Sequence, residues 1–207
     1  IGTSGGSITS TTGVLTGSSY TFNNTSSASV SAILAGSVNL TQAGSGTTTL
    51  SGANTYSGTT TISGGTLSIS ADSQLGSAPI SATSGSIVFN GGTLNTTATF
   101  TLNANRGIAM TGNGTINVDG STILTYNGII AGSGDLTKSG AGTLVLGGEN
   151  VYVGTTTVSA GTLNVTGTLS DSTAITVASG ATYIVGSNDT IASIAGAGNI
   201  TLTGNLT

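Results

Sequence analysis

Residues 39–69, NLTQAGSGTTTLSGANTYSGTTTISGGTLSI, return as residues 135–165, DLTKSGAGTLVLGGENVYVGTTTVSAGTLNV. A shift of 96 positions aligns the two segments without a gap, and more than half of the aligned positions are identical. Both segments consist almost wholly of Gly, Thr, Ser, Asn and aliphatic residues, which suit short strands and tight turns. Such self-similarity is typical of a solenoid, in which one supersecondary unit is stacked repeatedly. Stacked sheets form rods and surfaces more readily than a catalytic cleft.

A shorter phrase, Gly followed by Thr and alternating aliphatic residues, recurs along the chain. Its alternation has the period of two that is typical of a strand. Successive phrases begin about 22 residues apart on average, close to one coil of a three-sided parallel β-helix with inward aliphatic ladders. The phrases cover residues 46–50, 65–69, 92–94, 114–118, 142–146 and 161–165, with looser versions from 180 and 198. The chain is therefore predicted to be all-β, a parallel β-helix (solenoid) of roughly nine or ten coils with no substantial helix.

Two intervals between phrases are longer than the others. One runs from Gly65 to Gly92 and the other from Gly114 to Gly142. Because extra residues can loop out at a corner without disturbing the stack, we expect each interval to be one enlarged coil. These two coils are where a binding loop is predicted.

The composition excludes several classes of function. Charged residues make up 4% of the chain, and its net charge is −4. Binding of nucleic acid or of a membrane surface needs clustered Lys and Arg, which this chain lacks. No apolar run approaches the roughly 18 residues of a membrane span, so direct membrane insertion is not expected. The chain has no Cys, so it has neither a disulfide framework nor a thiolate metal site.

No change of composition marks a domain boundary. Residues 1–207 are therefore predicted to be one continuous β-helix segment, with repeat copies at 39–69 and 135–165. Because the sequence begins and ends inside repeat-like sequence, we expect it to be a piece of a longer protein.

The residues that usually carry catalysis are scarce. There is no His or Cys, so the common general bases, thiol nucleophiles and zinc sites are missing. Asp171 and Asp189 lie about one coil apart, and a carboxylate pair can hydrolyse glycosides at a suitable separation. Both lie in good turn sequences, and solvated turn residues are the preferred interpretation. The chain is predicted not to be an enzyme and to hold no catalytic residue, metal or cofactor.

Two features suggest ligand binding as an alternative. If Ile62 points inward, Thr59 and Thr61 point outward, and rows of Thr-x-Thr on a flat face can order water, as in some ice-binding proteins. Other coils lack this pair, which argues against a flat ice-binding face. Tyr56 and Tyr152 occupy the same place in the two copies. They are interpreted either as exposed aromatic residues that bind sugars or as turn residues that pack over a corner. Their identical placement favours the structural role.

The second copy closely resembles the passenger-associated transport repeat of bacterial autotransporters, the autotransporter-associated β-strand repeat. The shared pattern is Leu-Thr-Lys at 136–138, Gly-x-Gly-Thr-Leu at 140–144, Gly-x-Asn-x-Tyr-x-Gly at 148–154, Thr-Thr-x-Val at 155–158 and Gly-Thr-Leu at 161–163. The first copy departs from this pattern at Gln42 and Thr48, where the family has Lys and Leu. The resemblance implies a right-handed parallel β-helix in a secreted passenger domain, associated with export rather than with catalysis.

The predicted function is structural: an adhesin-like stalk segment of a secreted bacterial surface protein, located outside the cell. Its expected partner is a host or neighbouring-cell surface or the extracellular matrix. One alternative is a self-assembling extracellular filament or matrix subunit built by head-to-tail stacking, and another is an ice- or glycan-binding solenoid. The predicted structural repeat positions are Gly46, Leu50, Tyr56, Gly65, Leu67, Gly142, Leu146, Tyr152, Gly161 and Leu163.

Overall fold

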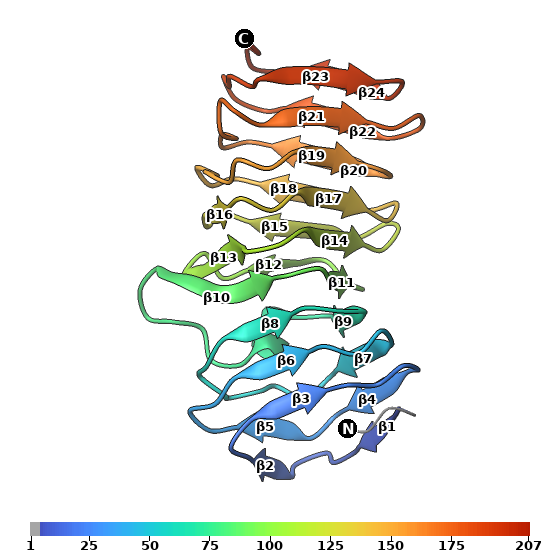
Figure 1. The fold of residues 1–207 in the computed structure, drawn as a ribbon, viewed down its shortest axis with the longest axis vertical. Helices are drawn as coiled ribbons and strands as arrows, with labels where there is room; N and C mark the ends of the chain where they lie inside the picture. The colour runs from blue at the N-terminus through green and yellow to red at the C-terminus, as the bar shows by residue number, and fades with distance from the viewer. Residues whose placement is uncertain (1–4) are drawn as a thin grey trace.

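The protein is a stack of short parallel strands, as seen in the computed structural model, which describes residues 5–207 (Figure 1). These residues form 24 strands and one four-residue 3-10 helix, η1 (Asp72–Leu75). The chain climbs from the blue N-terminal coils at one end to the red C-terminal coils at the other. The fold is an all-β parallel β-solenoid of about ten turns, which confirms the predicted fold class. No helix within residues 5–207 is long and apolar enough to cross a bilayer.

Three sheets and a short two-stranded sheet form the sides of the stack. The long sheet contains β1 (Gly6–Ile8), β4 (Ala28–Val30), β7 (Thr47–Leu50), β9 (Thr66–Ile69), β11 (Thr93–Thr96), β14 (Gly114–Val118), β17 (Leu136–Ser139), β19 (Thr156–Val158), β21 (Ala174–Val177) and β23 (Ser193–Gly196). The N-terminal sheet contains β3 (Tyr20–Phe22), β6 (Leu40–Gln42), β8 (Thr60–Ile62), β10 (Thr83–Phe89), β13 (Arg106–Met110) and β16 (Ile130–Gly132). The C-terminal sheet contains β12 (Phe100–Leu102), β15 (Ile123–Tyr126), β18 (Thr143–Leu146), β20 (Thr162–Val165), β22 (Thr182–Val185) and β24 (Asn199–Leu202). The short sheet pairs β2 (Val14–Thr16) with β5 (Ile33–Ala35).

Inward aliphatic side chains form ladders, because parallel register places like positions above one another. In the long sheet, Leu94 pairs with Leu67 on one side and with Ile116 on the other. In the C-terminal sheet, Leu144 pairs with Leu163. All five side chains are buried, and burying such a side chain stabilises a fold by roughly 1.5–3 kcal/mol. The ladders therefore hold neighbouring coils together along the interior of the stack.

The interval from Gly65 to Gly92 is one enlarged coil, as predicted. Thr66 of β9 pairs with Thr93 of β11, so the whole interval separates two neighbouring strands of the long sheet. The extra residues form η1 and a loop, residues 77–82, that projects from the side of the stack before β10 (Figure 1). We name this loop the arm.

The interval from Gly114 to Gly142 is not an enlarged coil, so that prediction is wrong. Thr115 in the long sheet pairs with Thr137, so this coil is complete before the chain reaches Gly142. Thr143, in the next Gly-Thr-Leu phrase, belongs to β18 in the C-terminal sheet. The phrase has moved from one side of the stack to the next. Its alternation suits a half-buried strand on any side, so spacing alone does not reveal the change.

Candidate functional site

The two repeat copies build the same structure on different sides of the stack. The first copy contributes β6 and β8 to the N-terminal sheet and β7 and β9 to the long sheet. The second contributes β17 and β19 to the long sheet and β18 and β20 to the C-terminal sheet. Thr47 of the first copy is equivalent to Thr143 of the second. In the long sheet, Thr137 lies four coils after Thr47, and the chain then reaches Thr143 on the next side of the stack. The shift between the two copies is therefore four coils plus one side.

Each copy places a buried Asn at the corner between its second and third strands. The side-chain oxygen of Asn54 accepts a hydrogen bond from the backbone N–H of Leu34 in the preceding coil at 2.8 Å. In the second copy, Asn150 accepts one from the N–H of Ile130 at 3.2 Å. Asn54 also donates to the carbonyl of Gln74 in the following coil at 2.6 Å. The carboxamide thus satisfies buried backbone groups that have no strand partner there, and which are costly to leave unpaired.

Tyr56 and Tyr152 are completely buried beside these Asn residues, so the sugar-binding interpretation of the two side chains is wrong. The Tyr56 hydroxyl hydrogen-bonds Thr60 Oγ1 at 2.7 Å, and Tyr152 makes the same bond with Thr156. Burial raises the pKa of Tyr56 to about 12, and it raises the pKa of Tyr152 too, because the phenolate would be desolvated. Both phenols therefore stay neutral and pack inside the corner.

The other predicted repeat positions form strands and tight corners. Gly65 and Gly161 have φ angles of +49° and +64°, a conformation that side chains disfavour. A Cβ at Gly46 would clash with the carbonyl oxygen of Ser26 in the preceding coil, and Gly142 approaches its neighbouring coil as closely. The inward leucines are all buried: Leu50, Leu67, Leu146 and Leu163. These positions therefore serve the packing of one coil on the next.

A buried cation caps another corner of the second copy. Lys138 is fully buried, and its ammonium group donates to the carbonyls of Ser139, Gly140 and Ala160 at 2.7, 2.8 and 3.1 Å. Gln42 has the equivalent place in the first copy and donates to two backbone carbonyls. Burial lowers the pKa of Lys138 to about 8, although its three acceptors favour the charged form. Sequence reasoning treated Lys138 only as a motif residue and missed this structural role.

Asp189 takes the place of the repeat Asn residues in the C-terminal part of the stack. It is only 7% exposed, and its carboxylate accepts a hydrogen bond from the backbone N–H of Leu169 in the preceding coil at 3.1 Å. Asn54 and Asn150 accept equivalent bonds. The interpretation as a solvated turn residue is therefore wrong for Asp189, whereas Asp171 is exposed. Burial raises the pKa of Asp189, and the charge of Asp171 raises it further.

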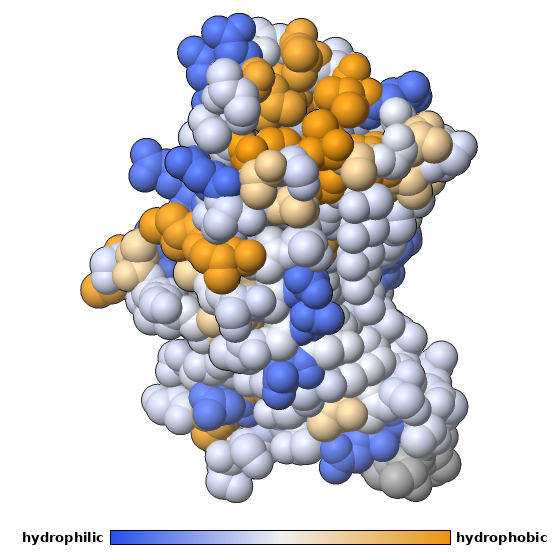
Figure 2. Space-filling view, turned by 45° about the horizontal axis from the view of Figure 1, so that its top comes forward, coloured by the Kyte–Doolittle hydropathy of each residue, from blue (hydrophilic) through white to orange (hydrophobic). Residues whose placement is uncertain are grey.

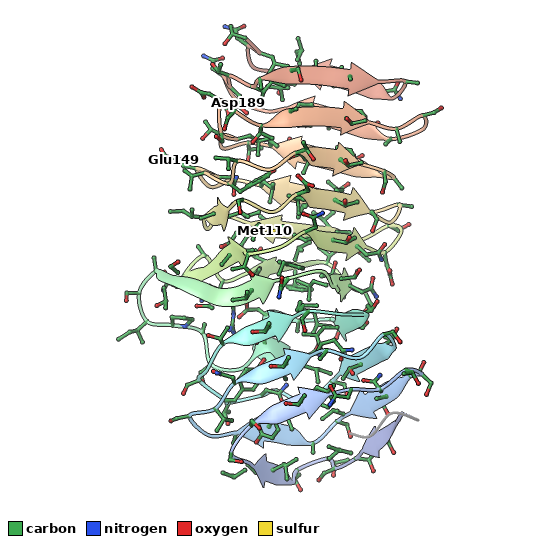
Figure 3. The ribbon with its side chains drawn as sticks, viewed as in Figure 1. Met110, Glu149 and Asp189 are labelled. Carbon is green, nitrogen blue, oxygen red and sulfur yellow. The ribbon has the colours of Figure 1, made fainter. Side chains whose placement is uncertain are left out.

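Asp171 and Asp189 line one hollow of about 410 Å³ at this corner of the stack. Figure 3 shows Asp189 and Glu149 on the same edge of the stack. The other lining residues are neutral: Thr168, Leu169, Asn188, Thr190, Asn205 and Thr207. Within residues 5–207, no cluster of three or more His, Cys, Asp or Glu residues could hold a metal ion. The Asp189 carboxylate accepts hydrogen bonds from the backbone N–H groups of Leu169 and Thr190.

Outward Thr side chains form a column along the long sheet. The strand pairs place the following residues above one another: Thr47, Thr66, Thr93, Thr115, Thr137, Thr157 and Thr176. A neighbouring column is linked by side-chain hydrogen bonds and contains Ser68, Asn95, Asn117 and Ser139. The homologous Thr61 and Thr157 lie in the N-terminal and the long sheet, respectively. The Thr-x-Thr rows of the two copies therefore do not stack into one face.

An ion pair holds the base of the arm, and no sequence signal pointed to it. Arg106 is 3% exposed, and its Nε donates to Asp72 Oδ1 at 2.9 Å. The same guanidinium donates to the carbonyls of Leu75 and Gly76 at 2.8 and 2.7 Å. Bidentate pairing with added backbone bonds is what a buried guanidinium needs to offset its desolvation. The enlarged coil is thereby fixed to the coil that follows it.

The sequences of known proteins identify the repeated unit. Residues 40–69 and 136–165 match the Passenger-associated-transport-repeat family. The two copies are passenger-associated transport repeats. The chain is also 40% identical over 143 residues to the Adhesin BmaC autotransporter of Brucella suis biovar 1 (strain 1330). This alignment covers 69% of the chain but only 4% of that relative.

No solved structure matches the chain. This family match confirms the resemblance that was predicted from the residues of the two copies. The matched segments contain the corners with Asn54 and Tyr56 and with Asn150 and Tyr152. They end at the last residues of β9 and β20.

Proposed function

We propose that this chain is a stalk segment of a secreted bacterial surface protein. The observation that carries the proposal is the long sheet, whose ten strands pair without a break from β1 to β23. Each further coil adds about 4.8 Å to the stack. Because coils in a solenoid contact mainly their neighbours, such a segment extends in one direction and separates whatever lies at its two ends. The family match implies an extracellular or cell-surface location.

We further infer that the repeats assist export and that the segment serves an adhesive protein. The relative is named an adhesin and an autotransporter, and the repeat family is named for passenger transport. In the structure, each corner Asn bonds a backbone group of the preceding coil. A coil that reaches the outside can therefore dock on the one before it, and this docking would bias the chain against sliding back. The adhesive target is a host or neighbouring-cell surface or the extracellular matrix.

Secretion of two matched variants tests this proposal. Leu144 points into the core from β18, whereas its neighbour Val145 points outward and is half-buried. Leu144→Asp should lower the amount of passenger on the cell surface severalfold and make the remainder sensitive to protease, because it places a charge in the core. Val145→Asp should leave both unchanged. Equal surface amounts for wild type and Leu144→Asp would contradict a role of coil docking in export.

End-to-end assembly into a filament is the alternative function, because a parallel solenoid has unpaired strand edges wherever its stack ends. Ile200 and Leu202 of β24 are exposed, although their partners Tyr183 and Val185 in the coil before are buried. A further coil of the same chain or the end of a second copy would cover these side chains. Fibres that lengthen with protein concentration in electron micrographs would support the filament. Rods of uniform length at all concentrations would exclude it.

A further inference from the structure

A hollow lies between the arm and the coil that carries β8. Its volume is about 400 Å³, within the range of roughly 300–1,000 Å³ that is typical of small-molecule sites. Ser57 and Thr59 line it from the first repeat copy, and Pro79, Ile80 and Ser84 line it from the enlarged coil. We name it the polar hollow. The enlarged coil, in which a binding loop is predicted, therefore forms one wall of a concave surface.

The polar hollow exists because the enlarged coil leaves the parallel ladder at this point. β10 begins before its pairing with β8, which starts only where Ile87 lies opposite Thr60. One coil earlier, the carbonyl of Val38 accepts a hydrogen bond from the N–H of Gly58. Within residues 5–207, no backbone N–H bonds the carbonyl of Gly58 in the same way. The arm thus opens a gap between two coils that are hydrogen-bonded further along.

Fixed contacts hold the arm that walls this hollow. Asn105 donates to the carbonyl of Pro79 in the arm at 2.9 Å. Arg106 donates to the carbonyl of Gly76, directly before the arm, at 2.7 Å, and its ion pair with Asp72 fixes the guanidinium. A ligand therefore does not have to order the arm, and avoiding that entropic cost favours binding.

The lining offers hydrogen-bonding groups that the protein does not use. The hydroxyls of Ser57, Thr59 and Ser84 have no partner within residues 5–207, and neither has the side-chain nitrogen of Asn39. The Asn39 oxygen accepts the N–H of Thr59 at 2.9 Å, which fixes the orientation of this amide. A Ser or Thr hydroxyl both donates and accepts, and an Asn amide nitrogen donates. Sugar hydroxyls, which also donate and accept, are matched by such a set.

The charge balance of the polar hollow favours a neutral ligand. Of its lining residues, all of which lie within residues 5–207, Arg106 alone is charged, and the ion pair with Asp72 offsets this charge. Ile80 is 102% exposed relative to the reference value for its residue type, and with Pro79 it gives the hollow an apolar edge. The C–H face of a sugar ring can pack on such an edge. Figure 2 shows the arm projecting from the stack, with a surface of mostly near-neutral hydropathy below it.

We propose that the polar hollow binds the end of a neutral oligosaccharide. Hydroxyls of the terminal sugar bond Ser57, Thr59 and Ser84, and its C–H face packs on the apolar edge of the arm. This inference rests on the proposed adhesive role and names neutral glycans as the class of target. An extended peptide fits less well, because β8 and β10 pair again from Ile87 and leave no long free edge for a further strand. Weak single sites on many neighbouring stalks add through effective concentration.

NMR titration of the whole chain with neutral sugars tests the site. The probes are di- and trisaccharides of glucose, galactose, mannose and N-acetylglucosamine. At least one should shift the amide signals of Ser57, Thr59 and Ser84 with a Kd below about 10 mM. Thr59→Val removes one hydroxyl with little change in size and should weaken this binding about fivefold or more, as loss of one hydrogen bond does. Thr155→Val is the matched control, because Thr155 is the equivalent residue of the second copy and does not line the hollow.

The outcomes separate this inference from the stalk function. Thr59→Val should leave the surface amount and the protease resistance of the passenger unchanged, so the secretion test with Leu144→Asp stands by itself. The glycan site is overturned if no probe shifts the three amides at up to about 10 mM. It is also overturned if Thr155→Val weakens binding as much as Thr59→Val does. A response to an extended Thr-Val peptide and to no sugar would assign the gap to strand addition and overturn it as well.

Discussion

The two repeat copies share their interior and differ in their surroundings. Asn54 and Asn150 make the same bond to the preceding coil, and Tyr56 and Tyr152 fill the same corner. Yet the first copy runs over the N-terminal and long sheets, whereas the second runs over the long and C-terminal sheets. The repeat therefore specifies how one coil is fastened to the next, and it works on any side of the stack.

The positions at which the copies differ show which parts are free to vary. Gln42 replaces Lys138 and still donates to backbone carbonyls, so what is kept is the donor and not the charge. Thr55 in the first copy is replaced by the exposed Val151 in the second. Interior positions keep a bonding function, and outer positions can acquire a surface function without loss of the fold.

Removing the corner Tyr should have the largest effect, and an equal one in both copies. Tyr56→Ala and Tyr152→Ala each delete a fully buried aromatic side chain, for which a loss of about 3–5 kcal/mol is expected. Urea unfolding followed by circular dichroism measures the loss. Val151→Ala, an exposed neighbour, should change stability by less than about 0.5 kcal/mol. Losses that differ widely between the two Tyr variants would show that the two corners are not equivalent.

The corner Asn should come next. Asn150→Ala leaves the N–H of Ile130 without a partner inside the protein, which costs about 1–3 kcal/mol. Asn54→Ala should have a similar effect through Leu34. The urea midpoint of each variant measures this, with Asn127→Ala, outside both repeat copies, as the control. No destabilisation in either copy would mean that these side chains do not fasten the coils.

Asp189 sharpens the comparison because it is an acid at the place of an Asn. The pKa of Asp189 is higher in the folded protein than the value of 3.8 expected for the unfolded chain. The folded protein therefore holds the Asp189 proton more tightly than the unfolded chain does. This stabilising contribution is complete below pH 3.8 and is lost as the pH rises through the pKa of the folded state. Asp189→Asn should therefore be more stable than the wild type at pH 7, and this advantage should shrink on acidification. Urea midpoints of both proteins from pH 3.5 to 7 measure the difference. An advantage that grows toward low pH would contradict the assignment.

Replacement of Lys138 by Gln, the residue of the first copy, should have a smaller effect. Lys138→Gln preserves donation to the corner carbonyls, so stability at pH 7 should change by no more than about 1 kcal/mol. Between pH 8 and 10.5 the unfolded Lys holds a proton that the folded one has released, so Lys138 should make the wild type gain stability with pH. Buried tyrosines oppose this gain near pH 10. Both proteins contain the same tyrosines, so the difference between their free energies of unfolding is free of the tyrosine effect. A difference that does not change with pH would contradict the lowered pKa of Lys138.

The smallest effect is expected at the outer valines. Val151→Thr and Val153→Ser give the second copy the residues of the first at these positions, so stability should stay within about 0.5 kcal/mol of the wild type. Thermal unfolding measures this. A large loss would show that the valines belong to the core rather than to a surface.

The sequence predicts the solenoid and its ladders because alternation and recurrence are local signals. Leu67 and Leu163 are recognisable as inward residues from their own phrases alone. It does not predict on which side each phrase lies, since the strands have three to seven residues and the same pattern suits every side. The misplaced Gly142 phrase is a direct result.

Contacts between distant residues also escape sequence reasoning. Asp72 and Arg106 are far apart in the chain and meet only because the enlarged coil brings them together. Asp189 looks like any turn aspartate until the fold places its carboxylate against the backbone N–H of Leu169 in the preceding coil. The motif did mark Asn150 and Lys138, but it could not tell what their side chains bind.

The most direct test of the account is amide hydrogen exchange at Leu34 and Ile130. Both N–H groups are bonded by an Asn side chain of the next coil. If the repeat corners fasten the coils, these amides exchange as slowly as those of buried strands such as β11, and Asn54→Ala or Asn150→Ala speeds the exchange of its own partner. Exchange of Leu34 and Ile130 as fast as that of the exposed arm would contradict the central claim.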